Sequence, residues 1–196
     1  MRILLTAYEP FGSVTENITE RVADKIQMGW KSTEDELVVL KLPVLWSRAE
    51  TLLTRALDRL NPDVVVSMGH AEGYPAITVE TRYFNIAEGA DNQGKVREGG
   101  VIRRGGEDFY DTNVDADGLA KFLTHKKVPV VVHGGKEGMT YLCNFAGYVV
   151  MRHIRETGRE KPLFIFLHLP PDALPFLRLV RGVTKVTEFL VAEARP

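Results

Sequence analysis

The feature that most constrains this chain is its alternation of short apolar runs with longer amphipathic segments. Strands are predicted at residues 2–7, 37–42, 63–68, 76–81, 128–133 and 163–167, and helices at residues 15–28, 46–60, 116–123, 142–156 and 183–194. Most of the strand runs are apolar throughout, which is typical of strands buried on both faces. The alternation predicts an α/β fold, a three-layer α/β/α sandwich with a mainly parallel central sheet.

Two stretches are less regular. Residues 76–81 alternate between apolar and polar side chains, which favours a shorter and more exposed strand. Residues 88–113 are rich in glycine and charge and are predicted to form a long functional loop. No repeat, low-complexity block or linker divides the chain, so residues 1–196 are predicted to form a single domain.

Charge and cysteine content exclude several classes of protein. The net charge is −1, so no strong field attracts the chain to nucleic acid or to an anionic membrane. No run approaches the ~20 apolar residues of a membrane span, and the N-terminus lacks the apolar core of a signal peptide. The single cysteine excludes an internal disulfide and fits a reducing compartment. We therefore expect a cytoplasmic protein.

The candidate nucleophile is that cysteine, Cys143. It follows a predicted strand and a glycine-bearing loop and falls at the first turn of the helix at residues 142–156. Unpaired backbone N–H groups and the positive end of the helix dipole favour the thiolate there, which is the nucleophilic form. The alternative is a small, inert core residue, which is the commoner role of a free cysteine.

A base for this thiol is expected at the carboxyl edge of the sheet, where sites of α/β proteins gather. His168 ends a predicted strand there and is suited to take the thiol proton and return it to a leaving amine. His70 and His133 also end predicted strands, so position alone does not exclude them. Glu80, in an alternating strand, is suited to orient the histidine, although an exposed strand glutamate is the simpler interpretation.

Other chemistries find no support in the sequence. No His-x-x-x-His pair or cysteine pair offers metal-ligand spacing, so no metal is expected. No phosphate loop or dinucleotide fingerprint is present, so no cofactor is expected.

Five segments, in order, resemble the pyroglutamyl peptidase type I family of cysteine peptidases. They are residues 7–12 (Ala-Tyr-Glu-Pro-Phe-Gly), residues 69–85 with Glu80, residues 91–94 (Asp-Asn-Gln-Gly), residues 141–144 (Tyr-Leu-Cys-Asn) and residues 166–170 (Phe-Leu-His-Leu-Pro). The likeness covers nearly the whole chain in one register. It implies removal of N-terminal pyroglutamate from peptides, and the family's frequent oligomers imply a homo-oligomer.

The resemblance also implies roles for single residues. Cys143 is the nucleophile, His168 the base and acid, and Glu80 the residue that orients the histidine. Tyr8, Phe11, Tyr141 and Leu142 occupy positions that wall the family's pyroglutamyl pocket, and His70 adjoins them. A flat, uncharged lactam suits an aromatic-lined slot.

The surroundings of these residues depart from the family pattern. Tyr74 and Thr81 replace arginines, His70 replaces glutamine or leucine, and Met139 replaces a small residue next to the cysteine motif. Met139 is expected to crowd the oxyanion region, and His70 and Tyr74 to reshape the pocket. Two alternatives to the peptidase therefore stay open: a cysteine amidase that acts on another small amide or lactam, and a non-catalytic relative that binds a small molecule.

Overall fold

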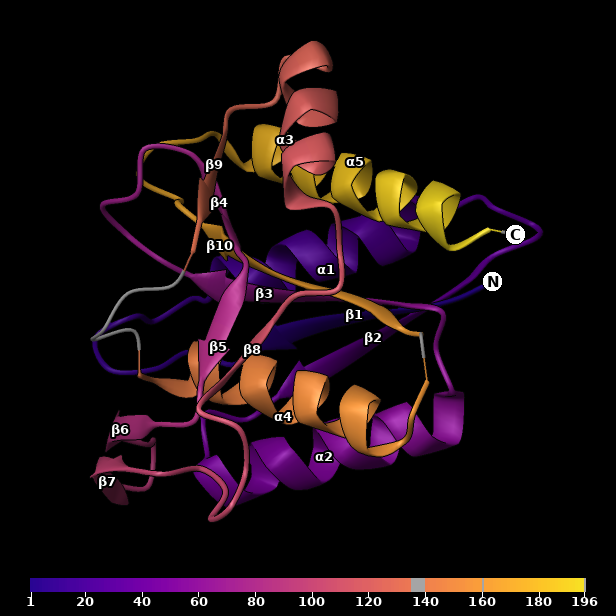
Figure 1. Cartoon of the computed structure of the whole chain (residues 1–196). Coiled ribbons are helices and arrows are strands. Elements are labelled where there is room, and N and C mark those ends of the chain that lie inside the picture. The colour runs from indigo at the N-terminus through magenta and orange to yellow at the C-terminus, as the bar shows by residue number, and fades with distance from the viewer. Residues whose placement is uncertain (135–139, 160, 196) are drawn as a thin grey trace.

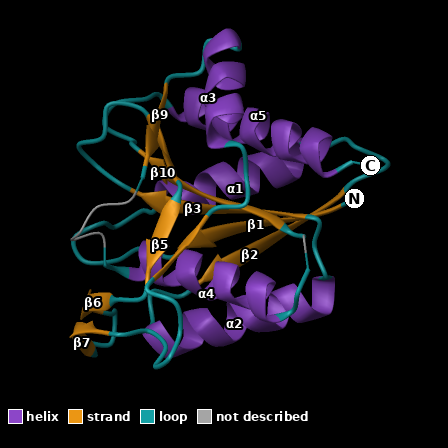
Figure 2. Ribbon diagram, in the orientation of Figure 1, coloured by secondary structure: helices purple, strands orange, loops and turns teal. Residues whose placement is uncertain are grey.

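The computed structural model describes residues 1–134, 140–159 and 161–195, which fold around one six-stranded sheet. The sheet order is β2-β1-β3-β10-β4-β9. Its strands are β1 (Arg2–Tyr8), β2 (Glu36–Leu42), β3 (Val64–His70), β4 (Ile77–Glu80), β9 (Val130–His133) and β10 (Leu163–Leu169). Helices cover both faces of the sheet (Figure 1, Figure 2), which confirms the predicted three-layer α/β architecture.

The helices divide between the two faces. Helices α1 (Ile18–Gly29), α3 (Ala116–His125) and α5 (Phe176–Ala194) lie on one face, and α2 (Trp46–Leu60) and α4 (Leu142–Glu156) lie on the other (Figure 1). Alternate residues of the strands supply the two cores. Leu5 and Ile165 face the first helix group, whereas Leu4 and Phe166 face the second. Each fully buried aliphatic side chain of this kind contributes about 1.5–3 kcal/mol of burial free energy.

The sheet is mainly but not entirely parallel. Strands β2, β1, β3 and β10 run in one direction, while β4 pairs with β10 in antiparallel fashion and β9 runs parallel to β4. The end of β9 therefore points away from the carboxyl edge of β10. His133, which strand position alone did not exclude as a base, therefore does not end at that edge.

Two other predictions need correction. Strand β4 was expected to be exposed, but all four of its residues are buried, because β10 and β9 flank it and α5 covers it through Ile77. Residues 88–113 are more ordered than a loop. They contain most of the hairpin of β6 (Ala87–Ala90) with β7 (Val96–Gly100), and they contain β8 (Phe109–Asp111), which pairs with β5 (Arg82–Phe84).

The last helix begins seven residues earlier than the sequence predicts. Glycine is a poor helix former, so Gly182 is an unusual residue for the interior of a helix. In the structure Gly182 lies inside α5, and a Cβ atom there would collide with Ile77 of β4. The glycine therefore allows α5 to pack closely onto the sheet. Within the described ranges, no helix combines the length and the apolar character that crossing a bilayer requires.

Candidate active site

Cys143 lies in the first turn of α4, directly after Leu142. Its neighbour Asn144 fixes this end of the helix. The Asn144 side chain is buried, donates hydrogen bonds to the carbonyls of Phe84 (2.9 Å) and Ile86 (2.8 Å), and accepts one from the Phe84 N–H (2.6 Å). The N-cap residue Tyr141 provides no side-chain capping bond, so backbone N–H groups of the first turn remain available to a ligand.

The cysteine sulfur lies against β3. A Cβ atom at Gly69 would come within 3.0 Å of the sulfur and 2.9 Å of Cε1 of Phe166, so only glycine fits between these groups. Gly69 is also the register partner of His168 on the adjacent strand β10. Partners in parallel strands project their side chains to the same face. The sulfur and the His168 imidazole therefore lie on the same face of neighbouring strands.

Glu80 contacts the imidazole from the other side of β10. Nε2 of His168 lies 3.2 Å from Oε2 of Glu80, and both side chains are buried. The antiparallel pairing makes this contact, because Glu80 is opposite Phe166 and projects to the same face as His168. The second ring nitrogen, Nδ1, is buried and has no hydrogen-bond partner among the described residues. A proton on Nε2 directed to Glu80 leaves Nδ1 as a lone-pair acceptor.

The surroundings of Cys143 favour the neutral thiol over the thiolate. Burial raises the pKa of Cys143, the negative charge of Glu80 raises it further, and a backbone hydrogen bond lowers it by less. The expectation that the helix terminus favours the thiolate is therefore wrong for the resting protein, because desolvation outweighs the terminus. A base must remove the thiol proton before or during attack.

A small cavity adjoins the sulfur, and we call it the thiol cavity. All five predicted substrate-binding residues line it together with Cys143: Tyr8, Phe11, His70, Tyr141 and Leu142. Asn17, Val44 and Gly69 complete the lining. The sequence thus places these side chains at one site, and their roles toward a substrate are considered under the proposed function.

Two aromatic residues set the walls of the thiol cavity. The Tyr141 ring lies 5.4 Å from that of Trp46 and 6.2 Å from that of Phe11, and its hydroxyl donates to the Ala90 carbonyl at 2.8 Å. Tyr8 donates to the Leu142 carbonyl at 3.4 Å. Burial, and then the neighbouring Cys143, raise the pKa of the Tyr8 hydroxyl, so it remains a neutral donor.

Two of the family-like segments build the frame of the cavity. Oε1 of Glu9 accepts hydrogen bonds from the Val44 N–H (2.9 Å) and from Nδ2 of Asn92 (3.0 Å). Asp91 accepts from the backbone N–H of Trp46 at 3.3 Å. These contacts join the segment after β1 to the β6–β7 hairpin and to the start of α2. These hydrogen bonds give Glu9, Asp91 and Asn92 a structural role in the family-like segments, although none of the three lines the cavity beside the sulfur.

The remaining histidines differ in their surroundings. His70 lines the thiol cavity, and its Nδ1 accepts a long hydrogen bond from the Ile18 N–H at 3.5 Å. His153 lies on α4 beside Asp58 at 3.4 Å, and His125 ends α3. Among the described residues, only His168 pairs with a buried carboxylate, which distinguishes it as the candidate base.

Sequence reasoning gave no role to Gly69 or Asn144, and it expected Tyr74 to reshape the pocket, although Tyr74 is not among the residues that line the thiol cavity. Gly69 provides the space for the sulfur, Asn144 anchors the helix start, and Tyr74 stacks on His168 with ring centroids 5.4 Å apart. A glycine at the end of a strand and a departure from the family pattern were the only signals available for Gly69 and Tyr74. Met139, which was expected to crowd the oxyanion region, lies outside the described residues.

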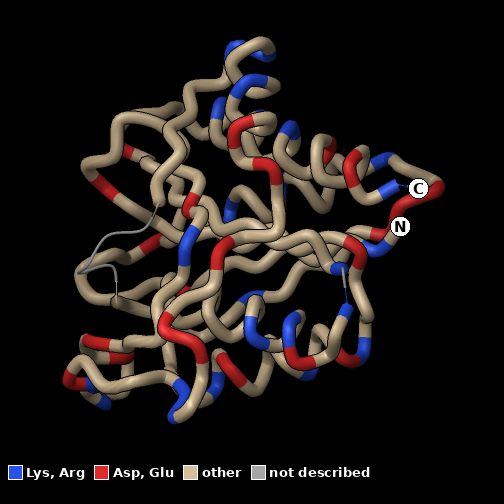
Figure 3. Tube along the Cα trace, in the orientation of Figure 1, with Lys and Arg blue, Asp and Glu red and all other residues tan. Residues whose placement is uncertain are grey.

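Charged groups do not gather at the site. Lysines, arginines, aspartates and glutamates are dispersed along the chain (Figure 3). In the described part of the chain, no group of three or more His, Cys, Asp or Glu side chains is arranged to hold a metal ion.

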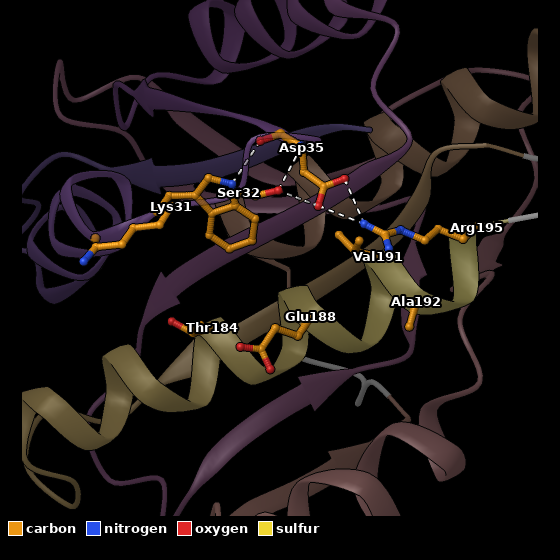
Figure 4. A pocket seen from close by; sticks show the side chains of 10 residues that line it. Lys31, Ser32, Asp35, Thr184, Glu188, Val191, Ala192 and Arg195 are labelled. Atoms are coloured by element: carbon orange, nitrogen blue, oxygen red, sulfur yellow. Dashed lines mark hydrogen bonds and ion pairs between the residues drawn. The ribbon is translucent and has the colours of Figure 1, made fainter.

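A second cavity, of about 830 Å³, lies at the amino ends of β1 and β2, and we call it the terminal cavity. Asp35 is its central group. Asp35 accepts hydrogen bonds from the N-terminal ammonium of Met1 (3.0 Å), Ser32 (3.0 Å) and Arg195 (3.1 Å). Figure 4 shows Ser32, Asp35 and Arg195 in this arrangement. Asp35 and Arg195 form an ion pair, and the cavity lining contains no cysteine or histidine.

Comparison with known proteins gives one consistent result. Residues 1–176 match the family model described as pyroglutamyl peptidase. The chain is 30% identical over 172 residues to a pyrrolidone-carboxylate peptidase of Pyrococcus furiosus, covering 87% of this chain and 81% of that protein. It is 32% identical over 176 residues to a pyrrolidone-carboxylate peptidase of Thermococcus onnurineus, covering 87% and 84%.

Solved structures agree. A mutant pyrrolidone carboxyl peptidase from Pyrococcus furiosus superimposes with a TM-score of 0.91 at 25% identity, over 100% of both chains. The pyrrolidone carboxyl peptidase of Fervidobacterium islandicum gives a TM-score of 0.90 at 26% identity, over 98% of this chain and 99% of that one.

Proposed function

The chain belongs to the pyroglutamyl peptidase family, and on this premise we propose that it is a cysteine peptidase that removes pyroglutamate from the N-terminus of peptides. One observation carries the proposal furthest. The imidazole of His168 contacts Glu80 through one nitrogen, and the sulfur of Cys143 lies on the same sheet face beside the register partner of His168. A cysteine and a histidine that pairs with a carboxylate, on one face of neighbouring strands, support a mechanism of nucleophilic acyl transfer.

The reaction starts from the neutral thiol. Nδ1 of His168 takes the thiol proton as the sulfur attacks the carbonyl carbon that follows the pyroglutamyl ring, and Glu80 stabilises the imidazolium through Nε2. Backbone N–H groups at the start of α4 stabilise the oxyanion. The tetrahedral intermediate collapses, the C–N bond breaks, and the imidazolium gives its proton to the leaving amine. Water, deprotonated by His168, then hydrolyses the thioester and releases pyroglutamate.

The thiol cavity suits the pyroglutamyl ring. The lactam is flat, small and uncharged, and the rings of Phe11 and Tyr141 form apolar walls beside the sulfur. Binding of an apolar ring in a narrow slot with a few polar groups is the usual mode of small-molecule recognition. Tyr8 and His70 supply polar atoms at the edge of the slot for the lactam N–H and carbonyl.

A second substrate class is favoured by one departure from the family pattern. His70 lies in the cavity lining and is able to carry a charge, unlike the glutamine or leucine of the family pattern. A histidine at this wall favours another small amide or lactam that bears an additional hydrogen-bond acceptor. The same thiol, base and carboxylate would then act on a different ring.

The single cysteine also bears on the compartment. Cys143 is half-buried and must stay reduced to react, which supports a reducing compartment such as the cytoplasm. A homo-oligomer remains a prediction from the family, and light scattering of the purified protein tests it.

Hydrolysis of a chromogenic pyroglutamyl amide tests the proposed function. We expect turnover by the native protein and loss of nearly all turnover in Cys143→Ala and Cys143→Ser. Full activity in Cys143→Ala would refute the mechanism. Silence of the native protein toward pyroglutamyl amides, with turnover of another lactam amide, would select the second substrate class. Binding of such compounds without any turnover would identify a non-catalytic relative.

A further inference from the structure

The imidazole of His168 has an aromatic neighbour that the mechanism above does not use. The ring of Tyr74 lies parallel to it, with an interplanar angle of 9° and a centroid separation of 5.4 Å. Phe166 also contacts the imidazole, at 5.2 Å, but its ring is tilted by 49°. Tyr74 is thus the ring that covers a face of the imidazole.

The contact with Glu80 alone leaves the imidazole a degree of freedom. A single hydrogen bond at Nε2 fixes the position of that nitrogen but not the plane of the ring about the line from Cβ to Nε2. Nδ1 has no hydrogen-bond partner in the described structure that would hold it. Rotation of the plane would change the direction in which Nδ1 points. Packing by a flat neighbour restrains that rotation, because offset stacking is favourable over a narrow range of angles.

The loop between β3 and β4 is fixed so that Tyr74 stays in place. The Ala71 N–H donates to the Leu169 carbonyl at 3.1 Å, directly after His168 in the chain. The Gly73 N–H donates to Oδ2 of Asp172 at 2.9 Å, and Gly73 has a φ of +80°, a conformation that favours glycine. Both anchors tie the Tyr74 loop to the segment that carries His168.

The charge state of Tyr74 fits this role. Partial burial raises the pKa of its hydroxyl, and the negative charge of Glu80 raises it further. The ring therefore stays neutral while the imidazole gains and loses its proton. It neither competes with Glu80 for the imidazolium nor removes the proton itself.

We propose that Tyr74 is a positioning residue, whose stacked ring holds the plane of the His168 imidazole so that Nδ1 faces the thiol of Cys143. The inference rests on the proposed peptidase reaction. The flat ring is the required feature, and the hydroxyl is not. Asp172 supports the same function indirectly, because it binds the Gly73 N–H in the loop that carries Tyr74.

Kinetics of Tyr74→Phe and Tyr74→Ala test this proposal. Tyr74→Phe keeps the ring and should keep kcat within about threefold of the native value. Tyr74→Ala should lower kcat by about 10- to 100-fold with KM nearly unchanged, because a misplaced base affects the chemical step more than substrate binding. Asp172→Ala should lower kcat in the same direction by less.

Tyr110→Ala is the matched control. Tyr110 is also partly buried, and its ring packs against that of Tyr148 at 5.0 Å on the far side of α4. It should lose a similar amount of stability with an unchanged kcat. If Tyr74→Ala does not fold, Tyr74→Leu, which keeps bulk without a flat ring, takes its place and should show the same fall in kcat.

Nuclear magnetic resonance of the imidazole gives a readout independent of turnover. The ring current of Tyr74 should shift the His168 ring protons upfield in the native protein and in Tyr74→Phe, and the shift should disappear in Tyr74→Ala. If the native protein shows no turnover, the proposed reaction is wrong. The chemical shift of the His168 ring protons would still show whether Tyr74 stacks on the imidazole. A kcat in Tyr74→Ala within twofold of native, or an equal fall in Tyr74→Phe, would overturn the positioning role.

Discussion

The thiol cavity and the terminal cavity lie at opposite ends of β1. The pKa of Cys143 is raised in the first, whereas the pKa of Asp35 is lowered in the second. The smaller thiol cavity keeps Cys143 neutral, because burial raises the pKa of its thiol. The larger terminal cavity keeps Asp35 charged. Partial burial alone would raise the pKa of Asp35, but hydrogen bonds from the N-terminal ammonium, Ser32 and Arg195 lower it.

The difference shows that volume does not identify a reactive site. In the terminal cavity the carboxylate of Asp35 is paired with the N-terminal ammonium and with Arg195, and the result is a link between Met1 and Arg195. In the thiol cavity Nδ1 of His168 has no partner within the described residues, and the sulfur retains its proton. Groups that are left with a proton to exchange are able to do chemistry, and groups that are fully paired are not.

The largest effect is expected at the carboxylate of the reactive site. Glu80→Gln keeps the shape of the side chain but removes the charge that stabilises the imidazolium of His168. We expect kcat for a pyroglutamyl amide to fall by about 10³- to 10⁴-fold. Glu193→Gln, an exposed carboxylate on α5, is the control and should leave kcat unchanged. A loss of less than about tenfold in Glu80→Gln would show that the carboxylate does not act on His168.

The shape of the thiol cavity depends on Gly69. In Gly69→Ala the added Cβ would displace the Cys143 sulfur or the Phe166 ring. We expect kcat to fall by about 10- to 100-fold and stability by about 1–3 kcal/mol, measured by steady-state kinetics and by urea unfolding. Gly29→Ala, at a glycine with open space around it, should change neither quantity appreciably. Unchanged kcat in Gly69→Ala would mean that the sulfur position is not critical.

The protonation of the resting thiol is open to direct measurement. Because burial raises the pKa of Cys143, the rate of its alkylation by iodoacetamide should rise steadily between pH 6 and about 9 without a plateau. At pH 7.5 the rate should be well below that of a free thiol with a pKa of ~8.5. A plateau reached by pH 7 would instead reveal a resting thiolate, and the contrast between the two cavities would not hold.

The smallest effect is expected in the terminal cavity. Asp35→Asn should lower the free energy of unfolding by about 1 kcal/mol at pH 7 and leave kcat unchanged, since three donors lose a charged acceptor near the surface.

The pH dependence of Asp35→Asn follows from the lowered pKa of Asp35 in the folded state. The stabilisation is complete above the unfolded pKa of ~3.9 and is lost as the pH falls through the folded pKa. Asp24→Asn, which breaks an exposed pair with Lys41, should have a much smaller effect at every pH. If Asp35→Asn and Asp24→Asn lower the free energy of unfolding equally, Asp35 contributes no more to stability than an exposed surface ion pair.

Much of the fold was predictable because apolar periodicity reports burial directly. The long strands β1, β3 and β10 and helix α2 are marked by apolar runs or by one apolar face, and all of them lie close to their predicted positions. Strand direction carries no such signal. The reversal of β4 and β9 depends on how the loops cross the sheet, so the sequence favoured an all-parallel edge and did not exclude His133 as a base.

The site was predictable to the level of residue types but not of contacts. The positions of Cys143, His168 and Glu80 followed from element ends and from the family resemblance, while the burial of Glu80 did not, because its strand alternates. The stacking of Tyr74 on His168 joins loops that are distant in sequence. The balance between helix terminus and desolvation at Cys143 depends on the atoms around the sulfur, which only a three-dimensional structure provides.

The position of β10 in the sheet has a consequence for biosynthesis. This strand carries His168, lies between β3 and β4, and follows both of them in the chain. A chain emerging from the ribosome therefore has a gap at the centre of its sheet until this late segment arrives and inserts. Until then Glu80 and Cys143 lack the histidine between them. This order of synthesis leaves the proposed site without its base until the β10 segment has been made.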